Sequence, residues 1–373
     1  MKKTTFIILC LEGALLSFNV AACSALIPSI SQEFKTSQFI AGNIIWLYML
    51  PYGLAALFYG PLVRVIDAKK IELVCFFLFS LANLIAALSQ DLNMLFIARF
   101  FMGLFGASVI PLVLILISHY ASDTNRGKLV GTFFSSTFVA SLVGLFLTGF
   151  IPWRLIFLIP AILGFILWIH IYFYLPSFKE IAIGFKFNYL TLFKAKKIIF
   201  IFAYIFLISL FYHGLQQWLG VYFSVRYSFS QLSISMLITS VSLSGIFGEV
   251  LGGWFSDFVG RLKIVNLGLI LMTISIFLLT AKWPIIVLAL IMIVWGLGWT
   301  FNHAGISTLL TDLPKEFLNE AASLNSSIRF LSGSIGVGLG GLLMQRNFNF
   351  GFVIFGICLV CLLSLTKPLL GNN

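Results

Sequence analysis

Long apolar stretches alternate with short polar turns along the whole chain. A helix needs about 20 apolar residues to cross the ~30 Å core of a bilayer, and most of these stretches are that long. Continuous runs of this length indicate helices rather than the short alternating strands of a barrel. The pattern predicts twelve transmembrane helices at 6–30, 40–63, 71–89, 93–118, 127–150, 153–175, 198–223, 232–256, 264–281, 284–310, 318–344 and 350–370.

The predicted helices fall into two sets of six. A short basic segment, 176–197, separates an N-terminal part, 1–175, from a C-terminal part, 198–373. A polar hairpin with glycines follows the second span of each half, from Gly60 to Lys70 and from Gly248 to Lys263. The repeat predicts an all-α membrane protein made of two pseudo-symmetric six-helix bundles.

Composition and charge support a membrane protein and exclude a soluble one. The 373 residues are 60% hydrophobic and 9% charged, which is more apolar surface than a soluble domain can bury. The net charge of +11 does not indicate a nucleic-acid partner, because most lysines and arginines fall on one side of the predicted bundle. This bias predicts a multi-pass protein of the cytoplasmic membrane with both termini in the cytoplasm. The cationic residues in the opposite, outer loops are Lys35, Arg154, Arg226, Lys282 and Arg346.

The sequence gives no reason to expect an enzyme, a cofactor or a metal. It has no GxxxxGK[ST] phosphate loop, so transport would be passive or driven by a gradient rather than by ATP. Cys358 and Cys361 are spaced like a metal pair, but they lie within a predicted span and no second pair accompanies them. No predicted span holds a nucleophile with its base.

The hairpins resemble the signature of the major facilitator superfamily, G-x-L-x-D-R-x-G-R-R/K. The second copy matches it at Gly253, Asp257, Gly260 and Arg261. The first copy keeps Gly60, Leu62 and Lys69, but Arg64 stands in place of the Asp and Asp67 in place of the second Gly. The resemblance covers essentially the whole chain and implies transport by alternating access.

Two further motifs resemble those of drug-exporter-like members. Arg99 and Gly103 form the Arg-x-x-x-Gly pattern of the fourth helix, which the resemblance ties to proton-coupled transport. Residues 153–157 form the Trp-Arg-x-x-Phe that opens the sixth helix. The chain departs from the pattern at Asn19, where exporters often carry an Asp, and the glycines of 144–149 have no accompanying proline.

The resemblance implies that helices one, four, seven and ten face the substrate cavity. Helical spacing places Glu12, Leu16, Asn19 and Cys23 on one face of helix one. The ionisable groups within spans are functional candidates, since burying a charge there is costly. Glu12 and Glu249 are expected to be the only carboxylates well inside spans. The candidate substrate-binding and coupling residues are Arg99, Glu12, Asn19, His213, Gln217, Trp299, His303 and Arg329.

Several of these residues also have purely structural interpretations. Arg99 would equally serve as a structural pair or a carbonyl clamp, and Glu249 as an interhelical hydrogen bond that supports the hairpin. His213 and His303 suit either a proton relay or a bridge between helices. Arg64 would either form a charge-swapped lock with Glu316 or Glu320, or contact lipid phosphate.

The function expected first is efflux of a small organic molecule by a monomer, with protons as the coupling ion that the resemblance allows. Uptake or exchange of an anionic metabolite is the alternative, because two intramembrane arginines face few carboxylates. A third possibility is a receptor or assembly factor that kept the fold and lost transport, for which the altered first hairpin is the motive.

Overall fold

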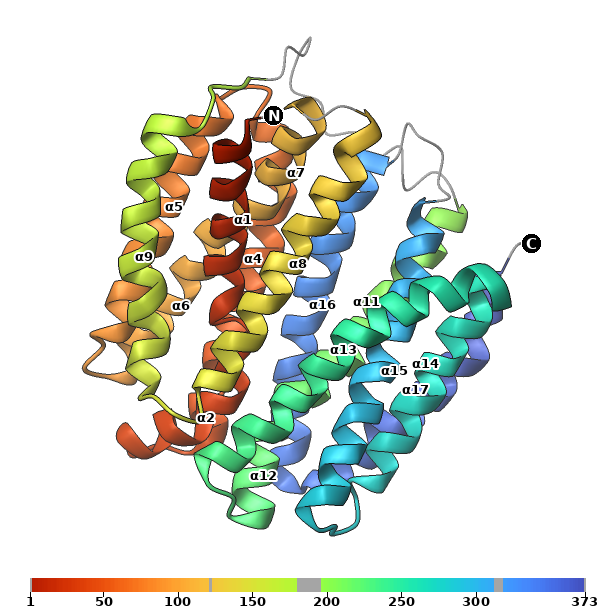
Figure 1. Ribbon diagram of the computed structural model, residues 1–373. Coiled ribbons are helices and arrows are strands. Elements are labelled where there is room, and N and C mark those ends of the chain that lie inside the picture. The colour runs from red at the N-terminus through yellow and green to blue at the C-terminus, as the bar shows by residue number, and fades with distance from the viewer. Residues whose placement is uncertain (1, 121–122, 180–195, 312–317, 372–373) are drawn as a thin grey trace. The chain divides into compact units, whose positions relative to one another are not determined.

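The computed structural model describes residues 2–120, 123–179, 196–311 and 318–371, and structural statements refer to these ranges. Every regular element described is a helix (Figure 1). The chain forms two compact units, Met1–Phe187 and Asn188–Asn373. The predicted connector, 176–197, lies largely outside the described residues, so its limits stay a prediction.

Unit 1 contains the first six predicted spans, three of which are each built from two helices in sequence. The N-terminal end of α1 and the C-terminal end of α9 lie at the same end of this unit (Figure 1). Its helices are α1 (Lys3–Phe18), α2 (Ala22–Glu33), α3 (Gln38–Ala41), α4 (Asn43–Leu62), α5 (Ala68–Ala87), α6 (Leu92–Gly106), α7 (Val109–Tyr120), α8 (Asp123–Leu147) and α9 (Trp153–Tyr174).

Unit 2 contains the other six predicted spans, and its first span is again built from two helices. Its helices are α11 (Lys196–Gln216), α12 (Leu219–Tyr227), α13 (Gln231–Val259), α14 (Arg261–Leu278), α15 (Ile285–Thr311), α16 (Leu318–Arg346) and α17 (Phe348–Leu370).

The same helix pairings occur in both units. In unit 1, α1 packs against α8, α4 against α6, and α5 against both α6 and α9. In unit 2, α11 packs against α16, α13 against α15, and α14 against both α15 and α17. Each pairing within unit 1 has a counterpart between the corresponding spans of unit 2. This correspondence confirms the predicted duplicated bundle.

The first predicted span is not one continuous helix. It bends by 43° between α1 and α2, so the described residues contain eleven apolar helices long enough to cross a membrane, or twelve when the bent pair is counted as one span. Asn19 caps the end of α1 and lies in this bend. Gly144 of α8 packs directly on the carbonyl group of Phe18, where a Cβ atom would collide with the backbone. This close contact explains why α8 carries a glycine beside the bend.

The second-half hairpin turns at a single residue. Helix α13 ends at Val259, Gly260 adopts a φ of +98°, and α14 begins at Arg261. Nothing lies within 4 Å of a Cβ atom built on Gly260, so its backbone conformation rather than its surroundings favours glycine there. Gly253 lies about two turns before Gly260, within α13, and the side chain of Asp257 lies outside the described part of the chain.

The first-half hairpin is built differently. Gly60 lies in the last turn of α4. Hydrogen-bonded turns follow the helix from Val63 to Ile66, and they include Arg64. The carboxylate of Asp67 accepts hydrogen bonds from the backbone N–H groups of Lys69 (2.9 Å) and Lys70 (3.4 Å). Asp67 is therefore the N-cap of α5, which is a local reason for an acid at this place. Glu316 and the side chain of Glu320 lie outside the described residues, so the proposed lock with Arg64 stays a prediction.

Candidate functional site

Arg99 is a buried cation held without a carboxylate partner. It projects from α6 with 1% of its surface exposed. Its Nε donates a hydrogen bond to the carbonyl oxygen of Ile44 at 3.0 Å, and its guanidinium carbon lies 4.3 Å from the ring centroid of Tyr48. One terminal nitrogen, Nη1, has no hydrogen-bond partner in the part of the chain that the structure describes. The carbonyl-clamp interpretation therefore describes its position, and the aromatic face offsets part of the cost of the buried charge.

Asn19 is engaged in holding helices together. Its amide nitrogen donates a hydrogen bond to the side-chain oxygen of Asn83 on α5 at 2.6 Å. Its backbone carbonyl accepts a hydrogen bond from the Cys23 thiol at 3.1 Å. Both contacts lie at the bend between α1 and α2, so Asn19 stabilises this bend.

Glu12 and Glu249 were expected to be the only carboxylates well inside spans, and the structure adds a third, buried carboxylate near the start of one. Glu72 lies in the second turn of α5 and is 1% exposed, while Glu12 on α1 is fully buried. The two carboxyl groups lie within hydrogen-bonding range of each other. Sequence reasoning missed Glu72 because it lies at the edge of a predicted span, where an acid is expected to reach water. The signal that marks it is the apolar run that surrounds it, from Ile71 to Phe79.

In unit 2, three aromatic rings from two helices form a stack. Tyr212 of α11 lies against Trp299 of α15, with ring centroids 3.7 Å apart and planes inclined by 9°. Tyr212 also stacks with Trp295, one turn earlier on α15, at 5.6 Å and 15°. The Trp295 indole donates a hydrogen bond to the side-chain oxygen of Gln216 at 2.6 Å. Tyr212 was not among the predicted site residues, and its adjacency to His213 is the only sequence signal for it.

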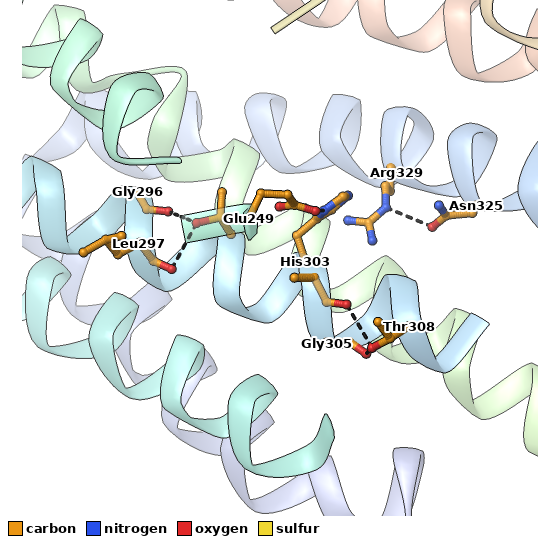
Figure 2. A network of polar contacts seen from close by, with 10 residues as sticks. Glu249, Gly296, Leu297, His303, Gly305, Thr308, Asn325 and Arg329 are labelled. Atoms are coloured by element: carbon orange, nitrogen blue, oxygen red, sulfur yellow. Dashed lines mark hydrogen bonds and ion pairs between the residues drawn. The ribbon is translucent and has the colours of Figure 1, made fainter. Parts of the chain in front are cut away.

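Glu249 and His303 form a pair between two helices. The carboxylate of Glu249 on α13 lies 2.7 Å from Nδ1 of His303 on α15 (Figure 2). Their side chains are 32% and 28% exposed. The two side chains therefore bridge α13 and α15. The pair also places a titratable group next to the aromatic stack.

Arg329 of α16 lies beside the Glu249–His303 pair (Figure 2). Its Nε donates a hydrogen bond to the side-chain oxygen of Asn325 at 2.9 Å, and the residue is 9% exposed. Both terminal nitrogens lack a hydrogen-bond partner among the described residues. The guanidinium carbon lies 5.8 Å from the Trp299 ring centroid, and the Glu249 carboxylate is close enough to act on it electrostatically. Figure 2 shows the guanidinium beside the Glu249–His303 pair.

The two remaining predicted residues lie where α11 ends: His213 is in its last turn, and Gln217 directly follows its last residue, Gln216. The His213 ring contacts Trp299 in an edge-on arrangement with centroids 6.0 Å apart. Within the described ranges, Nδ1 of His213 and the side-chain oxygen of Gln217 have no hydrogen-bond partner. The structure therefore gathers His213, Trp299, His303 and Arg329 into one cluster in unit 2. We call these residues, together with Tyr212 and Glu249, the unit 2 cluster.

The unit 2 cluster combines flat apolar surfaces with donors and acceptors that are only partly satisfied. Such a combination suits an organic molecule that stacks on a ring and forms a few hydrogen bonds. Among the described residues, no group of three or more His, Cys, Asp or Glu side chains is arranged to hold a metal ion.

Comparison with known proteins extends the picture to the whole chain. The family model of the Major Facilitator Superfamily matches residues 9–337 and, in a second match, 227–370. Multidrug resistance protein 1 of Bacillus subtilis is 22% identical over 377 residues, which span 98% of this chain and 96% of that protein. Azole resistance protein 1 of Saccharomyces cerevisiae is 28% identical over 181 residues, but the match spans only 29% of its length.

Solved structures share the fold at low sequence identity. The nucleoside transporter NupG superposes with a TM-score of 0.74 at 17% identity, covering 97% of this chain and 99% of its own. A bacterial homologue of the human lysosomal transporter Spinster superposes with a TM-score of 0.78 at 12% identity, and the match covers 98% of this chain and 97% of that chain. These similarities extend over both units, as do the family matches. The chain is therefore a multi-pass membrane transporter that belongs to the Major Facilitator Superfamily.

Proposed function

We propose that this transporter expels a small organic molecule from the cell by alternating access, in exchange for protons. The observation that carries the proposal is the unit 2 cluster, in which a ring stack lies beside a buried guanidinium and a carboxylate–histidine pair. An exporter of organic molecules needs such a surface, because stacking tolerates varied substrates while charged groups select among them. The similarity to Multidrug resistance protein 1 along nearly the whole chain supports efflux as the direction.

Proton coupling is supported by buried ionisable groups in unit 1. Arg99 and Glu12 are both nearly or fully buried, and neither forms an ion pair with an opposite charge that the described residues provide. Isolated ionisable groups inside a membrane are costly, so they indicate a function. The proposal places both termini in the cytoplasm, on the basis of the lysine and arginine distribution, and takes the monomer as the working unit.

Exchange or uptake of an organic anion is the second candidate. It is favoured by the two terminal nitrogens of Arg329 and by Nη1 of Arg99, for which the described residues supply no hydrogen-bond partner. Guanidinium groups bind carboxylates and phosphates in a bidentate manner. An anionic substrate would supply the acceptors that these nitrogens lack.

One experiment separates the two candidates. The purified protein is reconstituted into liposomes, and the uptake of a cationic and an anionic aromatic dye is followed with and without an interior-acid pH gradient. Cation uptake that needs the gradient supports proton-coupled efflux. Anion exchange that does not depend on the gradient supports the second candidate. Flux equal to that of protein-free liposomes for both dyes contradicts both.

A further inference from the structure

Two glutamates from distant parts of the sequence meet inside unit 1. Glu12 lies in the third turn of α1 and Glu72 in the second turn of α5. Their side chains are 0% and 1% exposed, and their carboxyl groups lie within hydrogen-bonding range of each other. The Arg99 clamp and the unit 2 cluster do not involve this pair.

The described surroundings of the pair provide neither a hydrogen-bond donor nor a positive charge to stabilise two carboxylates. None of its four carboxyl oxygens accepts a hydrogen bond from another group of the described residues. Glu72 lies close enough to Tyr59 and Cys75 to act on both electrostatically. The Tyr59 hydroxyl donates its hydrogen to the carbonyl oxygen of Leu104 at 2.9 Å, and the Cys75 thiol donates to the Tyr59 oxygen at 3.5 Å. Both neighbours are therefore occupied elsewhere, and neither carries a positive charge.

The helices packed against α1 and α5 also supply no counter-charge among their described side chains. The relevant helices are α6, α7, α8 and α9. Their charged and titratable groups are directed to other partners or exposed to the surroundings. Arg99 contacts Ile44 and Tyr48, His119 packs on Phe178, Tyr120 donates a hydrogen bond to Ser177, and Arg154 pairs with Glu33. The exposed groups are Lys128, His170, Tyr172 and Tyr174.

Two carboxylates in this position would repel each other without any compensating donor. An ionised carboxylate is costly to bury, and two close together cannot both stay ionised. As carboxylates they have only acceptors to offer each other. A single proton removes both problems, because it cancels one charge and supplies the O–H donor for a short, charge-assisted hydrogen bond.

We propose that Glu12 and Glu72 form a proton-binding site in which the two carboxyl groups share one proton. The proton comes from a hydronium ion when water reaches the pair: one O–H bond of hydronium breaks, a carboxyl O–H bond forms, and a water molecule is left. Release leaves two carboxylates, so it requires that water reach the pair and solvate both charges. The binding of this proton does not depend on the proposed function. The further claim, that the pair carries the proton exchanged for substrate, rests on that function.

The binding claim is tested without transport. The thermal unfolding of the purified full-length protein in detergent is measured from mildly acidic to alkaline pH. The wild-type unfolding temperature should fall as the pH rises, since loss of the shared proton leaves two buried charges. Glu12→Gln and Glu72→Gln should each flatten this dependence, because the amide N–H donates a hydrogen bond to the remaining carboxylate. Glu33→Gln, which removes a carboxylate that pairs with Arg154, is the control and should keep the wild-type dependence.

Three results would overturn the site. One is a wild-type pH dependence that persists unchanged in both Gln variants. Another is a rise of the unfolding temperature at alkaline pH when sodium replaces choline in the buffer, which would indicate a metal-cation site. The third uses the wild type alone and needs no variant to fold: an infrared spectrum at neutral pH without the C=O band of a protonated carboxyl group in apolar surroundings.

The coupling role is tested separately in liposomes. If wild-type dye uptake depends on the pH gradient and both Gln variants lose that dependence, the pair is the coupling site. If both variants stay coupled, the pair binds a proton that transport does not use. A wild-type protein with the expected unfolding behaviour but no dye flux would contradict the proposed function and leave the proton site standing.

Discussion

The indole ring of Trp299 lies flat on the phenol ring of Tyr212, with centroids 3.7 Å apart, and the Arg329 guanidinium carbon lies 5.8 Å from the same indole. One tryptophan thus links the ring stack to a buried cation. Both terminal nitrogens of Arg329 lack a hydrogen-bond partner among the described residues, so the proposed binding site offers an aromatic surface with N–H donors beside it.

Replacing Trp299 with Ala should reduce dye transport by about tenfold, since aromatic pairs contribute roughly 0.5–1.5 kcal/mol beyond the area that they bury. Trp299→Phe keeps a ring on Tyr212 and should recover most of the flux. The matched control is Trp283→Ala, because Trp283 lies in the turn between α14 and α15, away from the unit 2 cluster. Equal flux of Trp299→Ala and wild type, measured as initial rates in liposomes, would remove the stack from the binding site.

Arg329 and Glu249 should set the charge preference in opposite directions. Arg329→Ala removes the cation beside Trp299, so the ratio of anionic to cationic dye uptake should fall by about tenfold or more. Arg329→Lys should recover part of it, because a point charge replaces the planar fork. Unchanged ratios in Arg329→Ala would show that the guanidinium is structural.

Glu249→Gln should shift the ratio the other way. The amide keeps a hydrogen bond between α13 and α15 through His303 and loses only the negative charge, so the unfolding temperature should stay close to that of the wild type. The dye ratio should move toward the anion. A shift toward the cation would contradict the proposed role of this carboxylate.

Arg99 should be needed for coupling rather than for folding. Arg99→Ala is expected to abolish gradient-driven uptake while the purified protein still elutes as a single monodisperse peak. Arg99→Lys should restore part of the uptake, since its ammonium keeps the charge beside Tyr48 but has no Nε–H to reach Ile44 in the same geometry. Wild-type uptake by Arg99→Ala would reject the assignment.

The two hairpin glycines offer a matched pair of stability variants. Gly260→Ala should lower stability by about 1–2 kcal/mol, because only the φ of +98° resists a side chain there. Gly253→Ala lies within helix α13, has equally open surroundings and should be neutral or slightly stabilising. Thermal unfolding of both variants in one detergent checks the difference, which equal shifts would contradict.

The apolar runs were sufficient to predict the fold, because a membrane helix must satisfy its own backbone within about 20 consecutive residues. The bend at Asn19 was not predictable in this way. No proline or glycine marks it, and its contacts with Asn83 and Gly144 come from other helices.

The site was predicted in part for a similar reason. The candidates named from the sequence included His213, Trp299 and His303, which share the unit 2 cluster. Spacing along one helix does not show what a neighbouring helix presents, so it missed the ring of Tyr212. It also missed Glu72, whose partner Glu12 lies sixty residues earlier and joins it only through the packing of unit 1.

The central claim, exchange of an organic molecule for protons, is tested most directly by following both movements in the same liposomes. Interior-acid liposomes that contain the wild-type protein and a luminal pH indicator receive the cationic dye on the outside. The account predicts that dye enters while the lumen becomes more alkaline, with the two rates proportional, and that Trp299→Ala slows both together. Dye entry with no change of luminal pH beyond that of protein-free liposomes would contradict proton exchange, and no entry at all would contradict efflux of such a molecule.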